Sequence, residues 1–135
     1  MVNSMCSKRV FKTKTFDRWA GGVVTDTALC ASADEIERGI WEADPGGGVC
    51  KKRVAVAGQG KSSSTRVLVA KKSAIAVVYI VGKKKSTPGS DFSDVEVAVT
   101  KAIAKSFHGM TSAQFDHLVA KGELKEICDD EGCGG

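Results

Sequence analysis

Lysine and arginine are concentrated in the middle of this chain, and they are the side chains best placed to do chemistry. Ten basic residues and no acidic one lie between residues 51 and 90, whereas the rest of the chain holds ten basic and all 16 acidic residues. Such segregation of charge indicates a surface that binds a polyanion. A solvated, lysine-rich sheet edge that discourages aggregation is the alternative. The ten residues are Lys51, Lys52, Arg53, Lys61, Arg66, Lys71, Lys72, Lys83, Lys84 and Lys85.

A cluster of cations without neighbouring carboxylates suits the cleavage of RNA by its own 2′-hydroxyl. That reaction needs a group to remove the hydroxyl proton, cations to stabilise the phosphorane, and a proton for the departing 5′-oxygen. A lysine crowded by other cations can act as the base, and the planar fork of arginine matches phosphate oxygens. Phosphate binding without chemistry requires the same residues and remains open. We expect no metal and no other cofactor at this segment.

Other catalytic motifs are absent from the sequence. The segment AVAGQGKSS resembles a phosphate-binding P-loop, but its first glycine position is Ala55 and the segment leads into a strand instead of a helix. Lys61 and the serines 62–64 still offer a cation and hydroxyl donors to a phosphate, with an ordinary hairpin loop as the alternative. The two histidines, His108 and His117, lie in a helical region away from the basic segment, so we expect them to be structural.

Length, cysteine content and hydropathy limit the class of protein. At 135 residues the chain predicts one domain, with residues 1–8 and 129–135 disordered. No run approaches the roughly 20 apolar residues that span a bilayer, and the N-terminus lacks a signal-peptide pattern. Five cysteines without a CxxC pair favour a reducing compartment over a disulfide framework or a zinc site. We therefore expect a cytoplasmic protein without membrane association.

The hydrophobic pattern predicts an α+β fold with helices on one face of an antiparallel sheet. Alternating residues predict a strand over 9–16, followed by a short helix near residues 17–20 and a longer helix from Thr25 or Asp26. β-Branched runs predict strands over 49–56, 65–70 and 74–81, the last apolar on both faces. Helices are expected from Ser90 or Asp91 to residue 107 and over 111–120, with a possible strand over 123–128. Apolar residues of the first of these helices recur at helical spacing and predict its apolar face: Phe92, Val95, Val99, Ile103 and Phe107.

The chain resembles the RelE/HigB-like toxins of bacterial type II toxin–antitoxin systems, within the RelE/ParE superfamily. The resemblance covers residues 10–127 and rests on the order and spacing of several segments: FKTKTFDRWA, ALCASADEIERGIWEAD, GGGVCKKRVAVAGQGKSSSTRVLVA, YIVGKKK and SAQFDHLVAKGELKEI. It implies a RelE/ParE-like antiparallel sheet of about four strands, packed against N-terminal helices and followed by C-terminal helices.

The resemblance also implies roles for individual basic residues. Lys52 and Arg53 resemble the cationic pair that approaches the 2′-hydroxyl, and Arg66 resembles the arginine that stabilises the phosphate. Lys84 occupies the place of an arginine that protonates the leaving group. Tyr79 either stacks on a base or belongs to the core of its strand. The expected site is catalytic Lys52, Arg53, Arg66 and Lys84, with RNA or phosphate bound by Lys51, Lys61, Ser64, Tyr79, Lys83 and Lys85.

The function that the resemblance implies is that of a toxin that cuts mRNA on the ribosome without a metal ion and so inhibits translation. Its expected partners are the ribosome, mRNA and a cognate antitoxin of the helix-turn-helix type. Two alternatives remain: a non-enzymatic gyrase poison of the ParE kind, and a nucleic-acid-binding module that has lost its activity. The basic strand and the Gly82-Lys83-Lys84 segment favour RNA.

Overall fold

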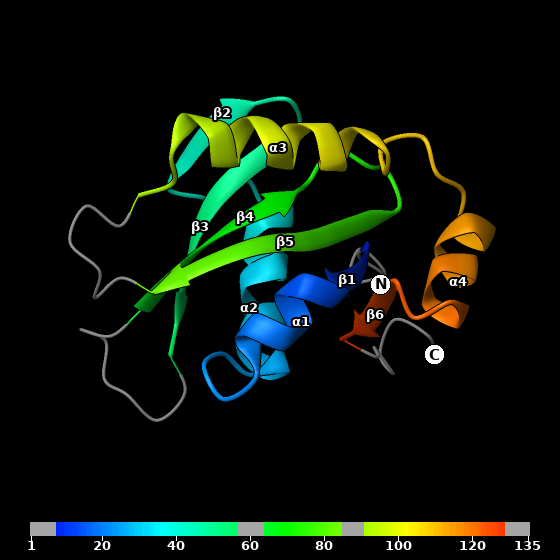
Figure 1. Ribbon diagram of the computed structural model, residues 1–135, viewed down its shortest axis with the longest axis horizontal. Coiled ribbons are helices and arrows are strands. Elements are labelled where there is room, and N and C mark those ends of the chain that lie inside the picture. The colour runs from blue at the N-terminus through cyan, green and yellow to red at the C-terminus, as the bar shows by residue number, and fades with distance from the viewer. Residues whose placement is uncertain (1–7, 57–63, 85–90, 129–135) are drawn as a thin grey trace.

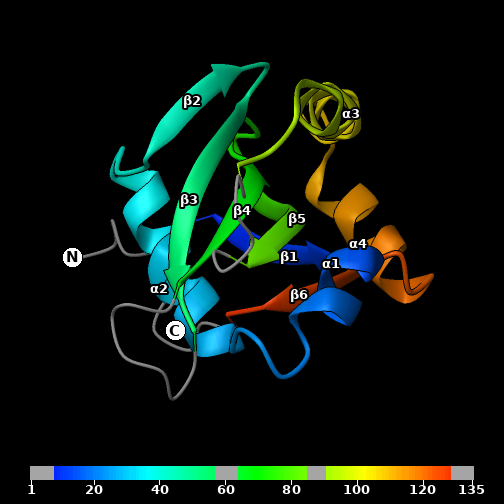
Figure 2. The same cartoon turned by 60° about the vertical axis from the view of Figure 1, so that its left-hand side comes forward.

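A mixed β-sheet organises the computed structural model, which describes residues 8–56, 64–84 and 91–128. Within these residues the sheet has six strands in the order β2-β3-β4-β5-β1-β6. Helices lie on both sides of it (Figures 1 and 2). The elements are β1 (Arg9–Thr13), α1 (Lys14–Ala20), α2 (Asp26–Glu37), β2 (Ala43–Gly46), β3 (Val49–Ala55), β4 (Ser64–Ala70), β5 (Ala76–Lys84), α3 (Asp94–Lys105), α4 (Ser112–Ala120) and β6 (Leu124–Ile127).

The expected sheet of about four antiparallel strands is too small and has the wrong topology, although the α+β class is correct. Strands β2 to β5 do form an antiparallel meander. However, β1 runs parallel to β5, with Val10 beside Val77, and β6 adds antiparallel to β1 at the edge, with Val10 beside Ile127. These last pairings join segments far apart in the chain, and periodicity within a segment carries no information about such partners.

The helices cover both faces of the sheet, not one face as expected. Helices α1 and α2 pack on one face against residues such as Val10, Val67 and Val77. Helices α3 and α4 pack on the other face against residues such as Phe11 and Leu68. Strand β5 lies inside the sheet and its first five residues are buried, which confirms the prediction of a strand covered on each side. An apolar surface on both faces of a sheet requires a layer over each.

Capping and glycine conformations set several element boundaries. The strand expected over 9–16 ends at Thr13, because the Thr13 hydroxyl accepts a hydrogen bond from the Phe16 N–H and caps α1. Thr25 caps α2 as predicted. Strand β2 was not predicted. It is joined to β3 by Gly47 and Gly48, whose φ angles of 68° and 77° suit a two-residue type I′ hairpin turn.

Helix α3 forms as expected, but its apolar residues do not all face the core. Val95, Val99 and Ile103 are 71%, 52% and 38% exposed, whereas the smaller Thr100 and Ala104 are fully buried against the sheet. The helix begins later than expected because Ser93 caps it, with a reciprocal hydrogen bond from the Ser93 N–H to Glu96. The inward face of α3 is thus formed by small residues and the partly buried Val97, whereas Val95, Val99 and Ile103 point to solvent.

A disulfide between Cys30 and Cys128 corrects the expectation that the cysteines form no disulfide framework. It joins α2 to the residue after β6, with the two Cα atoms 5.5 Å apart. The sequence separation of 98 hides this pair, because only the fold brings the two residues together. Cys50 is free and buried. Cys6 and Cys133 lie outside the described residues, as do the N-terminal residues 1–7 and the C-terminal residues 129–135, for which disorder was expected. No helix among the described residues is both long and apolar enough to cross a membrane.

Candidate nucleic-acid interface

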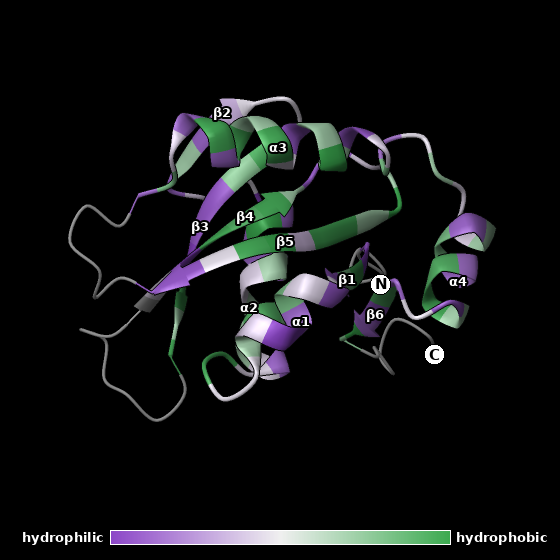
Figure 3. Ribbon diagram, in the orientation of Figure 1, coloured by the Kyte–Doolittle hydropathy of each residue, from purple (hydrophilic) through white to green (hydrophobic). Residues whose placement is uncertain are grey.

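Three cations form a row across neighbouring strands at one end of the sheet. Arg53 of β3 lies directly opposite Arg66 of β4, and Arg66 lies directly opposite Lys83 of β5. We call these three residues the cationic row. Figure 3 shows the accompanying change in hydropathy, since the ribbon of β5 passes from green in its middle to purple at its end. Like charges directly opposite each other destabilise a sheet, so the row is unfavourable for folding by itself and favourable for an anionic ligand.

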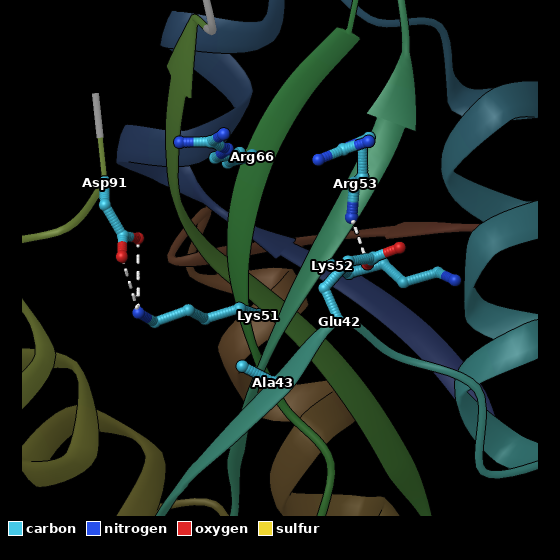
Figure 4. Close-up of a pocket in the computed structure, with 7 residues that line it drawn as sticks. All are labelled: Glu42, Ala43, Lys51, Lys52, Arg53, Arg66 and Asp91. Carbon is cyan, nitrogen blue, oxygen red and sulfur yellow. Dashed lines mark hydrogen bonds and ion pairs between the residues drawn. The ribbon is translucent and has the colours of Figure 1, made fainter. Parts of the chain in front are cut away.

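A shallow pocket lies beside the row on the face of the sheet that carries α3. Its volume is about 230 Å³. Figure 4 shows Lys51 extending across it to Asp91, and the Lys51 ammonium donates to both carboxylate oxygens at 3.1 Å. The residues that line this cationic pocket are Glu42, Ala43, Lys51, Lys52, Arg53, Arg66 and Asp91.

Two carboxylates hold the cations of this face in place. The Asp91 carboxylate accepts a hydrogen bond from the Phe92 N–H, and this bond together with Lys51 lowers the pKa of Asp91. The Lys83 ammonium donates to Glu96 at 2.8 Å on the first turn of α3. The same contact, with the backbone hydrogen bond from Ser93, lowers the pKa of Glu96. Both carboxylates are therefore charged at neutral pH and occupy cation positions that a phosphate would otherwise take.

Lys52 does not join Arg53 on this face, although the two were expected to act as a pair. Adjacent residues of a strand point to opposite faces, and Figure 4 shows Lys52 directed away from Lys51. The Lys52 side chain is 3% exposed and its ammonium lies 2.7 Å from the Glu35 carboxylate of α2. This pair lowers the pKa of Glu35. Lys51 and Arg53, two residues apart, are the cations of β3 that share the α3 face.

Tyr79 lies in the hydrophobic core, so the structure does not bring it to the interface as a stacking residue. It is fully buried between β5 and α2, and its hydroxyl donates to the Leu29 carbonyl at 2.9 Å and contacts Ser32. Burial raises the pKa of this phenol. The second reading of Tyr79, as a core residue of its strand, is confirmed.

The remaining predicted residues lie at the end of the sheet or outside the described part. Lys84 is exposed and pairs with Thr65, one position beyond the cationic row, so the strand alternation assigns it to the face opposite Lys83. Gly82 shares that opposite face, where the Trp19 indole of α1 packs so closely that a Cβ would clash with it. Ser64 begins β4, but its side chain is not described, and Lys61 and Lys85 lie outside the described residues.

The sequence contained a signal for which two cations of β3 share a face but none for the carboxylates. In a strand, cations two residues apart share a face, and that rule selects Lys51 and Arg53. Glu42 and Asp91 were not predicted as pocket residues. Glu42 reaches the pocket because β2 pairs with β3, where its carboxylate accepts a hydrogen bond from the Arg53 N–H. Asp91 reaches it because the chain returns over the sheet before α3. Both placements depend on tertiary structure.

The chain belongs to the family described as the RelE toxin of the RelE / RelB toxin-antitoxin system, whose family model matches residues 8–127. This match spans nearly all of the described residues, including the cationic row and both helical layers. Membership confirms the resemblance drawn from the sequence and implies an antitoxin as a partner. No curated protein and no solved structure matches the chain.

Proposed function

We propose that this protein is a toxin that cleaves mRNA on the ribosome, without a metal ion, and is neutralised by a cognate antitoxin. The observation that carries the proposal is the cationic row, Arg53–Arg66–Lys83, with Lys51 beside it in an open pocket. Three cations placed opposite one another repel, and their combined positive charge favours the binding of an anion beside them. The phosphodiester backbone of RNA is such an anion, and the chain belongs to a family of toxins.

The geometry favours a revised assignment of roles. In the proposed reaction, RNA displaces Asp91 and the Lys51 ammonium releases a proton to solvent; the 2′-oxygen then attacks phosphorus while its proton passes to the neutral Lys51 amine, which acts as the base. Arg66, at the centre of the row, holds two phosphate oxygens and stabilises the charge of the phosphorane. Lys83 gives a proton to the 5′-oxygen as the P–O bond breaks. The products are a 2′,3′-cyclic phosphate and a free 5′-hydroxyl. Lys51 and Lys83 thus replace Lys52 and Lys84, because the strand pleat places them on the same face as Arg53 and Arg66.

The experiment is an arrest assay with a reconstituted translation system and a defined mRNA, with cleavage sites mapped by primer extension. Wild-type protein is expected to cut mRNA only in the presence of ribosomes. Arg66→Ala should lower the cleavage rate on the order of 100-fold, because it removes a donor to the transition state. The melting temperature of the variant should stay close to that of the wild type, because the Arg66 side chain is not part of the hydrophobic core.

Two results would contradict the proposal. Arrest of DNA synthesis before protein synthesis in cells would favour the gyrase-poison alternative. Full activity of a folded Arg66→Ala variant would show that the cationic row takes no part in cleavage. Arg66→Lys serves as the matched control: it keeps the charge but loses the planar fork, and we expect it to retain binding and lose most of the cleavage rate.

A further inference from the structure

The outer surface of α3 carries an unbroken apolar stripe. Its members recur at i, i+3, i+4, i+7 and i+8, which places them side by side along one face of the helix. All five are exposed, and no charged residue of α3 interrupts them. They are Val95, Ala98, Val99, Ala102 and Ile103. We call this surface the α3 stripe.

The stripe is unusual because a helix on the surface of a sheet normally turns its charged residues to solvent. Here the buried face of α3 contains Thr100 and Ala104, while the larger Val99 and Ile103 stay in water. The Thr100 hydroxyl donates to the Glu96 carbonyl, so the buried polar group is satisfied within the helix. Rotating α3 to bury the stripe would bring its charged flank toward the sheet and break the Lys83–Glu96 ion pair. The apolar face is therefore left for another molecule to cover.

The stripe begins at the rim of the cationic pocket. Val95 precedes Glu96, whose carboxylate pairs with Lys83 of the cationic row. Asp91, which binds Lys51 in the pocket, lies three residues before the first residue of α3. A chain that lies along the stripe and continues past the start of the helix would therefore arrive at Arg53 and Arg66. Apolar side chains would bind the stripe, and carboxylates beyond them would complement the pocket.

We propose that the α3 stripe is the docking surface for an amphipathic helix of the antitoxin, whose flanking acidic segment continues into the cationic pocket. The helix would present Leu, Ile or Val at i, i+3, i+4 and i+7, because the small Ala98 and Ala102 leave room for larger partners. This inference rests on the antitoxin partner of the proposed function, and it does not depend on RNA cleavage.

A second copy of this chain fits the observations less well. A stable interface contributes about 20 to 30 residues from each side, and the stripe offers five. A second copy that docks through its own stripe would bring an identical cationic pocket to the interface and so would not neutralise this one. An antitoxin segment that covers the stripe and then the pocket contacts more of this surface than the stripe alone and supplies the opposite charge.

The test measures the affinity of the full chain for the antitoxin encoded with it, by isothermal titration calorimetry. Val99→Glu should weaken binding at least about 30-fold, because it places a charge at the centre of an apolar contact. Val95→Glu, at the more exposed of the two valines of the stripe, is the second variant and should show a similar loss. The matched control is Ile40→Glu, since Ile40 is 45% exposed but lies outside the stripe. Its affinity should stay within about threefold of wild type.

Equal affinities of the two stripe variants and wild type would overturn the proposal, and so would failure of the antitoxin to bind the wild-type chain. Sedimentation equilibrium supplies the alternative outcome: a wild-type dimer that Val99→Glu dissociates, with antitoxin affinity unchanged, would assign the stripe to a second copy. Ribosome-dependent cleavage without antitoxin should be unchanged in both stripe variants. If the wild-type protein does not cleave mRNA, the proposed nuclease activity is refuted, but the comparison of antitoxin affinities still tests the docking surface.

Discussion

Both faces of β3 carry basic side chains, but the lysine on one face is buried whereas the cations on the other line an open pocket. On the α2 face, Lys52 is buried and paired with Glu35, and on the same face of the sheet Lys12 of β1 is buried between Asp17 and Asp26. On the α3 face, Lys51 and Arg53 line an open pocket beside the other cations. The first face neutralises each buried lysine with a carboxylate of its own. The second gathers positive charge where an outside anion can reach it, so adjacent residues of one strand serve different purposes.

The strongest test of this difference replaces Lys51 and Lys52 with methionine, one at a time. Lys51→Met should lower ribosome-dependent cleavage about 100-fold, with little change in melting temperature, because it removes a cation from the pocket. Lys52→Met should leave cleavage near the wild-type rate, since its ammonium lies on the other face. The same primer-extension assay measures both rates. The reverse result, with only Lys52→Met inactive, would show that cleavage depends on Lys52 on the α2 face and not on the cationic pocket.

The next test concerns stability on the α2 face. Glu35→Gln leaves the buried Lys52 charge without its carboxylate, and we expect a loss of about 1 to 3 kcal/mol in the free energy of unfolding, reduced by the partial exposure of Glu35. The stabilisation depends on pH with a defined sign. Because the folded-state pKa of Glu35 is lowered, its contribution is present above the ordinary value of 4.5 and is lost as the pH falls through the folded value.

Urea unfolding at several pH values measures this effect. The free energy of unfolding of Glu35→Gln should fall less steeply below pH 4.5 than that of wild type. Asp94→Asn is a suitable comparison, as Asp94 is exposed on the opposite side of the sheet. Identical pH dependence of Glu35→Gln and wild type would mean that the Lys52–Glu35 pair contributes nothing to stability.

The smallest expected effect is on the α3 face, where we expect Asp91 to compete with phosphate for Lys51. Asp91→Asn keeps an oxygen for the Phe92 N–H but removes the negative charge, so affinity for a short single-stranded RNA should rise several-fold. Fluorescence anisotropy at low ionic strength, where the contribution of charge is largest, is the measurement. Glu35→Gln is the control, because it removes a carboxylate from the other face. An affinity unchanged or lowered by Asp91→Asn would show that the Lys51–Asp91 pair does not compete with RNA.

Much of the site could be predicted because local patterns record local structure. The basic segment, the β-branched runs of β3 to β5 and the cap at Thr25 were all evident in the sequence. Pairing Lys52 with Arg53 overlooked the alternation of a strand, which assigns these neighbours to opposite faces. The pocket carboxylates could not be predicted, because they come from β2 and from the segment before α3.

The amino-acid sequence by itself determined the α+β class, the family and the segment in which positive charge gathers, since each depends on composition or on periodicity over a few residues. Tertiary structure alone decided the parallel pairing of β1 with β5, the Cys30–Cys128 disulfide and the rotation of α3 that exposes Val95 and Val99. Each of these is a contact or an orientation between segments distant in the chain. Their free energy depends on which surfaces the whole fold brings together, and no single segment specifies it.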